Sequence, residues 1–265
     1  MGIQIIVCIK SIIANGPNER VARSSDSCEL NPYDRPVLEV ALRIREELGG
    51  TITALSMGPK PCAFTLNEAM AMGVDRGVLL NDPALAGADT LATSNALAAA
   101  IKKLTPFDLV LFGTRAADSD TGQVGPQTAV LLDLPLVTGA HSVEPKDDGL
   151  IVERSADGFL ECFEVFFPAG LAIHSSANQP RDVGLLGIEL AFEEREVKHW
   201  NLSDLDLSAD RVGEAGSATN VLALSRVESV RKCEFLSGSA VEQVDALINR
   251  LSASGRISPD SAAIW

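Results

Sequence analysis

The chain of 265 residues is 46% hydrophobic and carries a formal net charge of −14. This length fits one α/β domain, with or without an extension, and the apolar content is enough for a packed core. The acidic balance argues against nucleic acids and anionic membranes as partners, because both are bound through basic surfaces. No apolar run approaches the roughly 20 residues that cross a bilayer, so we expect no transmembrane segment.

Cysteine and histidine usage also argues against disulfides and metal sites. The five cysteines are scattered and form no CxxC pair, a pattern typical of free thiols in a reducing compartment. The three histidines lie far apart without the spacing of metal ligands, so we expect no metal site. The N-terminal segment has no basic start and no small-residue cleavage site, which argues against a signal peptide. We therefore expect a cytoplasmic protein.

The first half of the chain alternates strand and helix patterns. Short apolar runs predict buried strands, and the segments between them have helical periodicity. The predicted strands span residues 3–9, 51–56, 77–80 and 107–112, and the predicted helices span residues 36–48, 61–72, 89–104 and 127–134. Strands joined by helices through short connections are typical of a parallel sheet covered on both faces.

After Pro135 the pattern changes to consecutive strands. These are predicted at residues 136–143, 149–154, 159–166 and 170–175, with hairpin turns at Asp147-Asp148-Gly149 and Asp157-Gly158. Further on, residues 190–197 fit a helix or an extended arm, residues 208–219 a linker, and residues 239–251 an amphipathic helix. We expect an α/β fold with an open, mostly parallel Rossmann-like sheet, an antiparallel edge and an extended C-terminal arm. The expected division is a domain at residues 1–190 followed by a linker, arm and helix at residues 191–265.

The segment Gly113–Pro126, GTRAADSDTGQVGP, is the strongest candidate for a functional loop. It joins a predicted buried strand to a predicted helix, and a helix start offers free N–H groups and partial positive charge to a phosphate. Asp120 and Gln123 have the spacing of a capping box, so an ordinary capped helix is the competing interpretation. The loop is neither a Walker A motif nor a GxGxxG fingerprint.

Three other segments follow predicted strands or precede the first helix. They are Cys8 with Lys10, residues 31–36 (NPYDRP), and Met57 within SMGP. Each has a simple structural explanation, namely a buried thiol, a helix entry and a tight turn. Their shared position at the carboxyl ends of parallel strands nevertheless favours a ligand site. No nucleophile–base motif is visible, which favours a binding or electron-carrying module over a hydrolase.

Several segments together resemble the β subunit of electron transfer flavoproteins over nearly the whole chain. They are VCIK (7–10), LNPYD with EVALRIREE (30–47), SMGP (56–59), LNEAMAMGVDRGVLL (66–80), DTLATSNALAAAI (89–101), FDLVLFGTRAADSDTGQVGP (107–126), NQPR (178–181) and VDALINRLSASGRI (244–257). Each segment alone is a weak signal, whereas their order and spacing are specific.

The resemblance implies an adenine-nucleotide-binding domain that pairs with an α subunit carrying its own FAD. The family's nucleotide site matches Cys8, Asn31, Pro32, Tyr33, Asp34, Met57, Gly113, Thr114, Arg115, Ala116, Asp118, Ser119, Asp120, Thr121, Gly122, Gln123 and Val124. In ordinary members this site holds AMP; in electron-bifurcating members it holds a second FAD that takes a hydride from NADH. The loop sequence DSDTGQVGP resembles that of the bifurcating members and favours FAD as the ligand of this site, with AMP as the alternative. A stand-alone nucleotide-binding module is the alternative of another class.

The resemblance also implies partners. Leu185 matches the residue that anchors an acyl-CoA dehydrogenase, while the family's lysine run is replaced by Glu193-Glu194-Arg195-Glu196. This change suggests a different partner or a differently charged contact, although a solvated charged face explains it equally well. A bifurcating member would also deliver electrons to ferredoxin or flavodoxin, and the C-terminal arm would pack on the α subunit. The chain is then an electron carrier, with an NADH-oxidising flavin site only if it bifurcates.

Overall fold

The computed structural model describes residues 2–13, 27–146, 148–223 and 233–257. The chain divides into two compact units, Met1–Leu224 and Ser225–Trp265. Each unit is described by itself.

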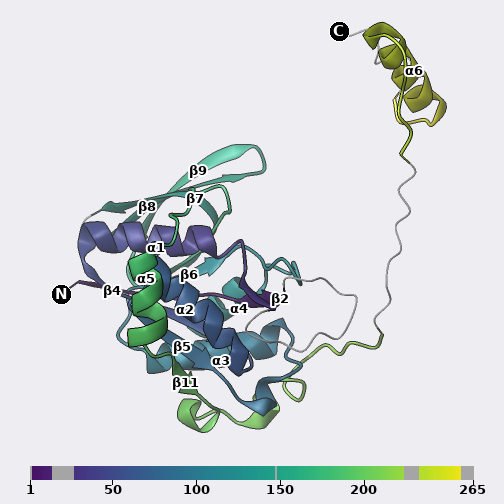
Figure 1. Ribbon diagram of the computed structural model, residues 1–265. Helices are drawn as coiled ribbons and strands as arrows, with labels where there is room; N and C mark the ends of the chain where they lie inside the picture. Colours follow the sequence, from purple (N-terminus) through teal and green to yellow (C-terminus); the bar gives the residue numbers. More distant parts are fainter. Residues whose placement is uncertain (1, 14–26, 147, 224–232, 258–265) are drawn as a thin grey trace. The chain divides into compact units, whose positions relative to one another are not determined.

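The first unit is built on a nine-stranded sheet of order β11-β5-β4-β1-β6-β10-β7-β8-β9 (Figure 1). The strands from β11 to β7 are parallel, whereas β8 and β9 form the antiparallel edge. Their bounds are β1 Ile3–Cys8, β4 Gly50–Met57, β5 Arg76–Leu80, β6 Leu109–Gly113, β7 Leu136–Lys146, β8 Gly149–Ala156, β9 Phe159–Phe166, β10 Ala169–Ile173 and β11 Lys198–Trp200. A separate two-stranded sheet joins β2 Ser11–Ile13 to β3 Cys28–Leu30. The expected fold class is confirmed.

Helices cover both faces of this sheet and divide the core in two. One apolar cluster contains residues of α1 and α2, and the other contains residues of α3. The helices are α1 Arg35–Leu48, α2 Ala63–Met72, α3 Thr90–Lys103, α4 Val124–Leu131 and α5 Leu185–Glu189, with short turns η1 Lys60–Cys62, η2 Pro83–Leu85, η3 Leu190–Glu194, η4 Ser203–Leu205 and η5 Ala209–Arg211. Local chemistry sets the helix ends: Asp89 caps α3 by accepting the N–H of Ala92, and Gly73 ends α2 at positive φ.

The antiparallel edge follows the sequence prediction closely. The turn between β8 and β9 is made by Asp157 and Gly158, both at positive φ, as a two-residue hairpin requires. The other predicted turn includes residue 147, which lies outside the described residues, while Gly149 begins β8 as expected.

The structure differs from the sequence prediction in three places. α4 begins at Val124 and ends at Leu131, so the helical pattern at residues 127–134 is offset by three residues. Pro126 falls in the first turn, as expected of a proline near a helix start. Residues 208–219 belong to the first unit instead of forming a free linker: Val212 is buried, and the Ser217 hydroxyl accepts the N–H of Asp89. The first unit accordingly continues past residue 190, and β11 adds a strand to the sheet.

The second unit contains α6, Ala240–Ala253, which confirms the amphipathic helix predicted there. Ser239 and Glu242 form a capping box at its start. Four large apolar side chains on α6 are exposed: Val241, Val244, Leu247 and Ile248. Among the described residues, no helix has the length and apolarity needed to span a bilayer.

Candidate functional site

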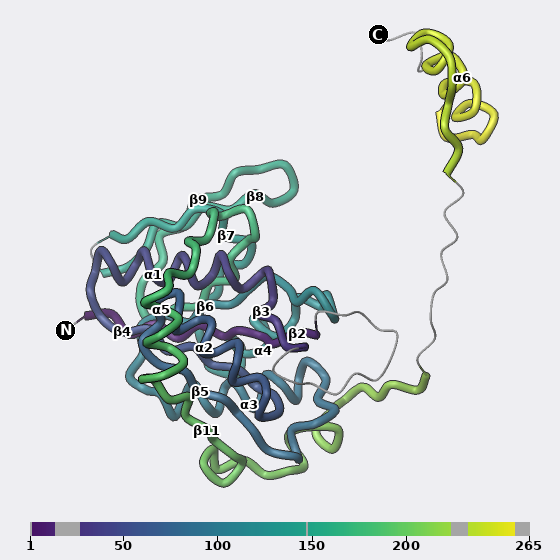
Figure 2. Tube along the Cα trace, in the orientation of Figure 1, coloured from purple at the N-terminus to yellow at the C-terminus, as the bar shows by residue number. Residues whose placement is uncertain are grey.

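The candidate site lies where the strand order of the sheet reverses. β1 lies between β4 and β6, and Cys8 is in register with Leu55 on one side and Phe112 on the other. The segments that follow these strands therefore leave the sheet as neighbours, and Figure 2 follows the chain from β1 into β2 and from β6 towards α4. In open α/β sheets this switch point is where ligands bind.

Asn31 fastens the loop before α1 to the loop after β6. Its side chain is buried; its Nδ2 donates to the carbonyl oxygen of Arg115 at 3.0 Å, and its Oδ1 accepts the N–H of Ala117 at 3.1 Å. Two bonds to one loop fix both the position and the orientation of the amide. The two predicted site segments, residues 31–34 and 113–124, are thus in direct contact.

Lys10, just after β1, reaches the same loop. Its Nζ donates to Oδ1 of Asp118 at 2.7 Å and to Oγ of Ser119 at 3.2 Å. Burial alone would raise the pKa of Asp118, but the hydrogen bond and charge of Lys10 outweigh burial and hold this pKa below its usual range. Asp118 is therefore ionised at neutral pH and paired with a cation.

Arg115 makes the second ion pair of the loop. Its guanidinium lies 3.2 Å from Oδ1 of Asp120 and 4.6 Å from the centre of the Tyr33 ring, a cation–π distance. Asp120 has a φ of 51°, a left-handed conformation that aspartate tolerates better than most residues. Both carboxylates of the loop are thus paired with basic side chains.

Asp34 and Cys8 are buried at the same end of the sheet. Burial raises the pKa of Asp34 to about 7, against the opposing effects of the Lys10 N–H, which reaches its Oδ2 at 2.7 Å, and of Asn31. Burial, and then the charge of Asp34, raise the pKa of the Cys8 thiol above its ordinary value. The thiol is therefore neutral and a poor nucleophile, which fits a binding site better than a thiol-based catalytic site.

The start of α4 has the features that a phosphate requires. Gln123 is the N-cap residue, and no side chain caps the helix. The predicted capping box of Asp120 with Gln123 is therefore wrong. Asp120 pairs with Arg115 instead. The first N–H groups of α4 have no side-chain cap and carry partial positive charge. Gly122, at a φ of 63°, forms the approach to this helix. An uncapped helix start behind a glycine-containing loop fits a phosphate-bearing nucleotide.

The other predicted residues lie at the same edge, with one exception. Met57 ends β4 beside β1, and Gly113 lies against Asp34: a Cβ at Gly113 would come within 2.3 Å of the Asp34 carboxylate. The exposed predicted residues are Pro32 and, in the loop, Arg115, Asp118, Ser119, Asp120, Thr121 and Gln123. The half-buried ones in the loop include Thr114, Ala116, Gly122 and Val124. Leu185 is the exception: it is 88% exposed on α5, which packs against α2.

Lys10 lies in a segment that the sequence places at this edge, but its contact with the loop is not predicted from the sequence. It lies 108 positions from Asp118, and only the pairing of β1 with β6 brings the two together. A signal was present in the sequence, because a lysine directly after a buried first strand falls at the ligand edge of a parallel sheet.

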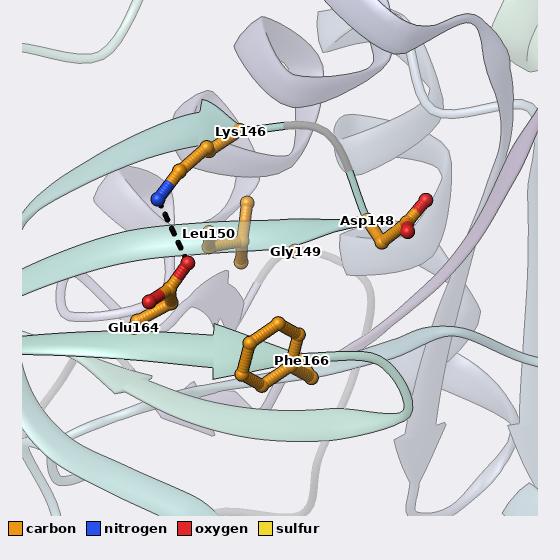
Figure 3. A pocket seen from close by; sticks show the side chains of 6 residues that line it. All are labelled: Lys146, Asp148, Gly149, Leu150, Glu164 and Phe166. Carbon is orange, nitrogen blue, oxygen red and sulfur yellow. Dashed lines mark hydrogen bonds and ion pairs between the residues drawn. The ribbon is translucent and has the colours of Figure 1, made fainter.

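Two surface hollows of the first unit are lined by residues other than the loop residues 113–124. One of about 180 Å³ at the antiparallel edge is lined by Lys146, Asp148, Gly149, Leu150, Glu164 and Phe166, and Figure 3 shows the 2.8 Å Lys146–Glu164 ion pair across it. Another of about 240 Å³ is lined by Leu91, Pro126, Gln127, Val130 and Leu131 on the apolar flank of α4. The candidate site is therefore defined by the hydrogen bonds and charges of its loops. Among the described residues, no cluster of histidine, cysteine or carboxylate side chains could hold a metal ion, and no disulfide joins any of the five cysteines.

Comparison with known proteins decides the family. The model of the electron transfer flavoprotein domain matches residues 20–205. The "Electron transfer flavoprotein subunit beta" of Thermoanaerobacterium thermosaccharolyticum is 43% identical over 224 residues, which are 84% of this chain and 86% of that one. The chain belongs to the electron transfer flavoprotein β-subunit family. The resemblance inferred from the sequence segments is confirmed.

Two further relatives in this family are named for acyl-CoA reductase complexes. The "Caffeyl-CoA reductase-Etf complex subunit CarD" of Acetobacterium woodii is 39% identical over 84% of this chain and 85% of its own. The "Acryloyl-CoA reductase electron transfer subunit gamma" of Anaerotignum propionicum is 33% identical over 94% of this chain and 97% of its own. The similarity to the second of these relatives thus extends into the C-terminal part of the chain.

Proposed function

We propose that this chain is the β subunit of a bifurcating electron transfer flavoprotein and that it holds FAD at the loop 113–126. The observation that carries the nucleotide site is the joined pair of loops at the switch point, where Asn31 bonds the loop in front of the uncapped start of α4. Relatives named for acyl-CoA reductase complexes support the role in electron transfer.

In this proposal the protein supplies binding and orientation, and the FAD, when bound, supplies hydride and single-electron chemistry. Backbone N–H groups of residues 118–124 and the Thr121 hydroxyl hold the diphosphate. Residues 31–34 and Met57 hold the adenine and ribose. Such a division of labour fits a site whose buried thiol is neutral and whose carboxylates are already paired.

The test is a count of nucleotides in the purified heterodimer. The chain is co-expressed with its α subunit, the complex is denatured, and the released nucleotides are separated and quantified. Two FAD per heterodimer is the expected result. One FAD with one AMP would support ordinary electron transfer in place of bifurcation and would still support the nucleotide site. No nucleotide beyond the α-subunit FAD would overturn the proposed nucleotide site itself. A chain that is stable and monomeric through residue 265, with no affinity for an α subunit, would favour the stand-alone module.

The segment after NQPR is proposed as the contact with an acyl-CoA dehydrogenase or reductase. Leu185, Leu186, Ile188 and Phe192 are all exposed, and the Phe192 ring lies 5.5 Å from that of Phe64 in α2. Exposed apolar groups gathered on one surface mark an interaction site. Leu185, the most exposed of them, is the proposed anchor.

Acidic side chains surround this apolar surface. Glu189, Glu193, Glu194 and Glu196 are exposed, while Arg195 turns inward and donates to the carbonyl oxygens of Val74 and Met70. The proposed partner therefore has an apolar pocket with a basic rim, because complementary charge favours association.

A substitution at the anchor tests this contact. Leu185→Ala is expected to weaken binding of the partner dehydrogenase by about tenfold or more, since a buried leucine contributes roughly 1.5–3 kcal/mol. Val130→Ala, at another exposed apolar side chain, is the matched control. Binding is measured by titration calorimetry with the heterodimer. Equal affinities of Leu185→Ala and the control would place the docking surface elsewhere.

A further inference from the structure

An acidic loop is an unfavourable place for a phosphate unless its charge is balanced. The loop 113–126 contains two carboxylates, Asp118 and Asp120, and the whole chain has a net charge of −14. Two like charges a few ångströms apart repel each other even near the surface of a protein. A phosphate held by the N–H groups of this loop would meet both carboxylates.

Each of these carboxylates has its own cation. Arg115, within the loop, pairs with Asp120 at 3.2 Å, and Lys10, from the other end of the sequence, pairs with Asp118 at 2.7 Å. The Lys10 ammonium uses a second N–H on Ser119 at 3.2 Å. A lysine with two partners in one loop both neutralises the loop and fixes its shape.

Lys10 is itself held firmly at the backbone. Its N–H donates to the buried Asp34, which lies against Gly113 at the start of the loop. Asp34 is also the N-cap residue of α1, so one buried residue links the end of β1 to the helix that follows. The Lys10 side chain therefore extends to the loop from a fixed point.

We propose that Lys10 is a positioning residue for the nucleotide: it neutralises Asp118 and holds the Asp118–Ser119 turn so that the loop can accept a phosphate. The proposal rests on the proposed function of the loop as the phosphate site. It assigns a role to a residue outside the set that the family resemblance points to. Lys10 acts through Asp118. The effects of the two substitutions on the free energy of nucleotide binding must therefore not be additive.

A double-mutant cycle tests this dependence. The heterodimer is stripped of nucleotide, and the dissociation constants of AMP and of FAD, used as separate probes, are measured by equilibrium dialysis. Lys10→Met is expected to weaken binding by about tenfold or more, because charge-assisted bonds are lost and Asp118 becomes an unpaired charge. Lys10→Met/Asp118→Asn is expected to recover most of that loss, and Lys10→Arg to stay within about threefold of the wild type.

Lys146→Met is the matched control, because it removes another lysine–carboxylate ion pair, which at 2.8 Å is close in length to the 2.7 Å pair of Lys10, at the antiparallel edge (Figure 3). It must leave both dissociation constants unchanged. Wild-type affinity in Lys10→Met overturns the proposal, as does a double variant as weak as Lys10→Met, which would indicate direct contact of the ammonium with phosphate. If Lys10→Met fails to fold, Asp118→Asn alone decides: retained or tighter binding supports the proposal and a tenfold loss overturns it. A wild type that binds neither probe refutes the proposed function itself.

Discussion

At the scale of single residues, the site depends on polar side chains buried at the carboxyl edge of the sheet. Asn31 is 1% exposed and Asp34 is 3% exposed, and both bond backbone groups of other segments. Buried polar groups of this kind are costly unless they are satisfied, so they specify how neighbouring loops are placed. Asp34 differs from Asn31 because it can change its charge near neutral pH.

Asp34 should make the stability of the chain depend on pH. The pKa of its carboxyl is about 7 in the folded state, above the ordinary value of 3.8, so the folded state binds this proton more tightly than the unfolded state. Its stabilising contribution is complete below pH 4 and is lost as the pH rises through 7. The difference amounts to at most about 4 kcal/mol.

Asp34→Asn removes this titration but keeps an oxygen for the Lys10 N–H. Urea unfolding of the variant between pH 5.5 and 8 is expected to show a flatter pH dependence than the wild type, with equal or greater stability at pH 8. Parallel pH profiles for the two proteins would contradict the proposed titration of Asp34.

At the scale of elements, the proposed docking segment, residues 185–196, is positioned by its close packing on α2. Gly187 allows this packing, because a Cβ there would come within 2.3 Å of the carbonyl oxygen of Ala71. Arg195 ties the other end of the segment to the last turn of α2 and to Val74. The exposed leucines are therefore held on a fixed base.

Gly187→Ala should displace α5 from α2. Gly184→Ala is the control and should leave α5 in place, because nothing lies within 4 Å of a Cβ at Gly184 and the Gly184 φ of −79° suits any residue. We expect Gly187→Ala to lower the free energy of unfolding by about 1–3 kcal/mol and to speed proteolysis within residues 185–196. Gly184→Ala should cost about 1 kcal/mol or less, as loss of a glycine N-cap does. Similar proteolysis rates in the two variants would show that the packing of α5 on α2 is not the constraint.

At the scale of the whole molecule, the buried core belongs to the first unit. Among the described residues, every buried hydrophobic side chain lies at or before Val212, and α6 buries none. The exposed stripe on α6, with Val244 and Leu247 at its centre, is the proposed contact with the α subunit.

Ending the chain at residue 224 should therefore leave the sheet intact and remove association with the α subunit. The melting temperature of the isolated subunit is expected to change by less than about 3 °C, equivalent to roughly 1 kcal/mol. Size-exclusion chromatography after co-expression measures association. The full chain with Val244→Ser and Leu247→Ser should also lose association, and the variant with Gln243→Ala should keep it. Retained association in the truncated chain would assign the contact to the first unit.

The order of strands and helices, the antiparallel edge and the loop before α4 could all be predicted from the sequence. They depend on local periodicity and turn chemistry, such as the apolar run before Gly113 and the Asp157-Gly158 turn. Family membership could also be inferred, because many short segments keep their order and spacing. Pro126 limits the start of α4 to the few residues before it, as observed, but the pairing of Asp120 with Arg115 in place of a capping box could not be predicted.

Only the tertiary structure decided how the site is held together. The Lys10–Asp118 ion pair joins residues 108 positions apart, and the bonds of Asn31 to the loop span more than 80. Such contacts depend on strand order, which places the ends of β1 and β6 side by side, and on burial, which moves the pKa of Asp34 toward neutrality. The sequence by itself predicted that a candidate phosphate loop lies at the carboxyl edge of a parallel sheet. The fold decided which charges balance that loop, because a charge acts through distance in space and not along the chain.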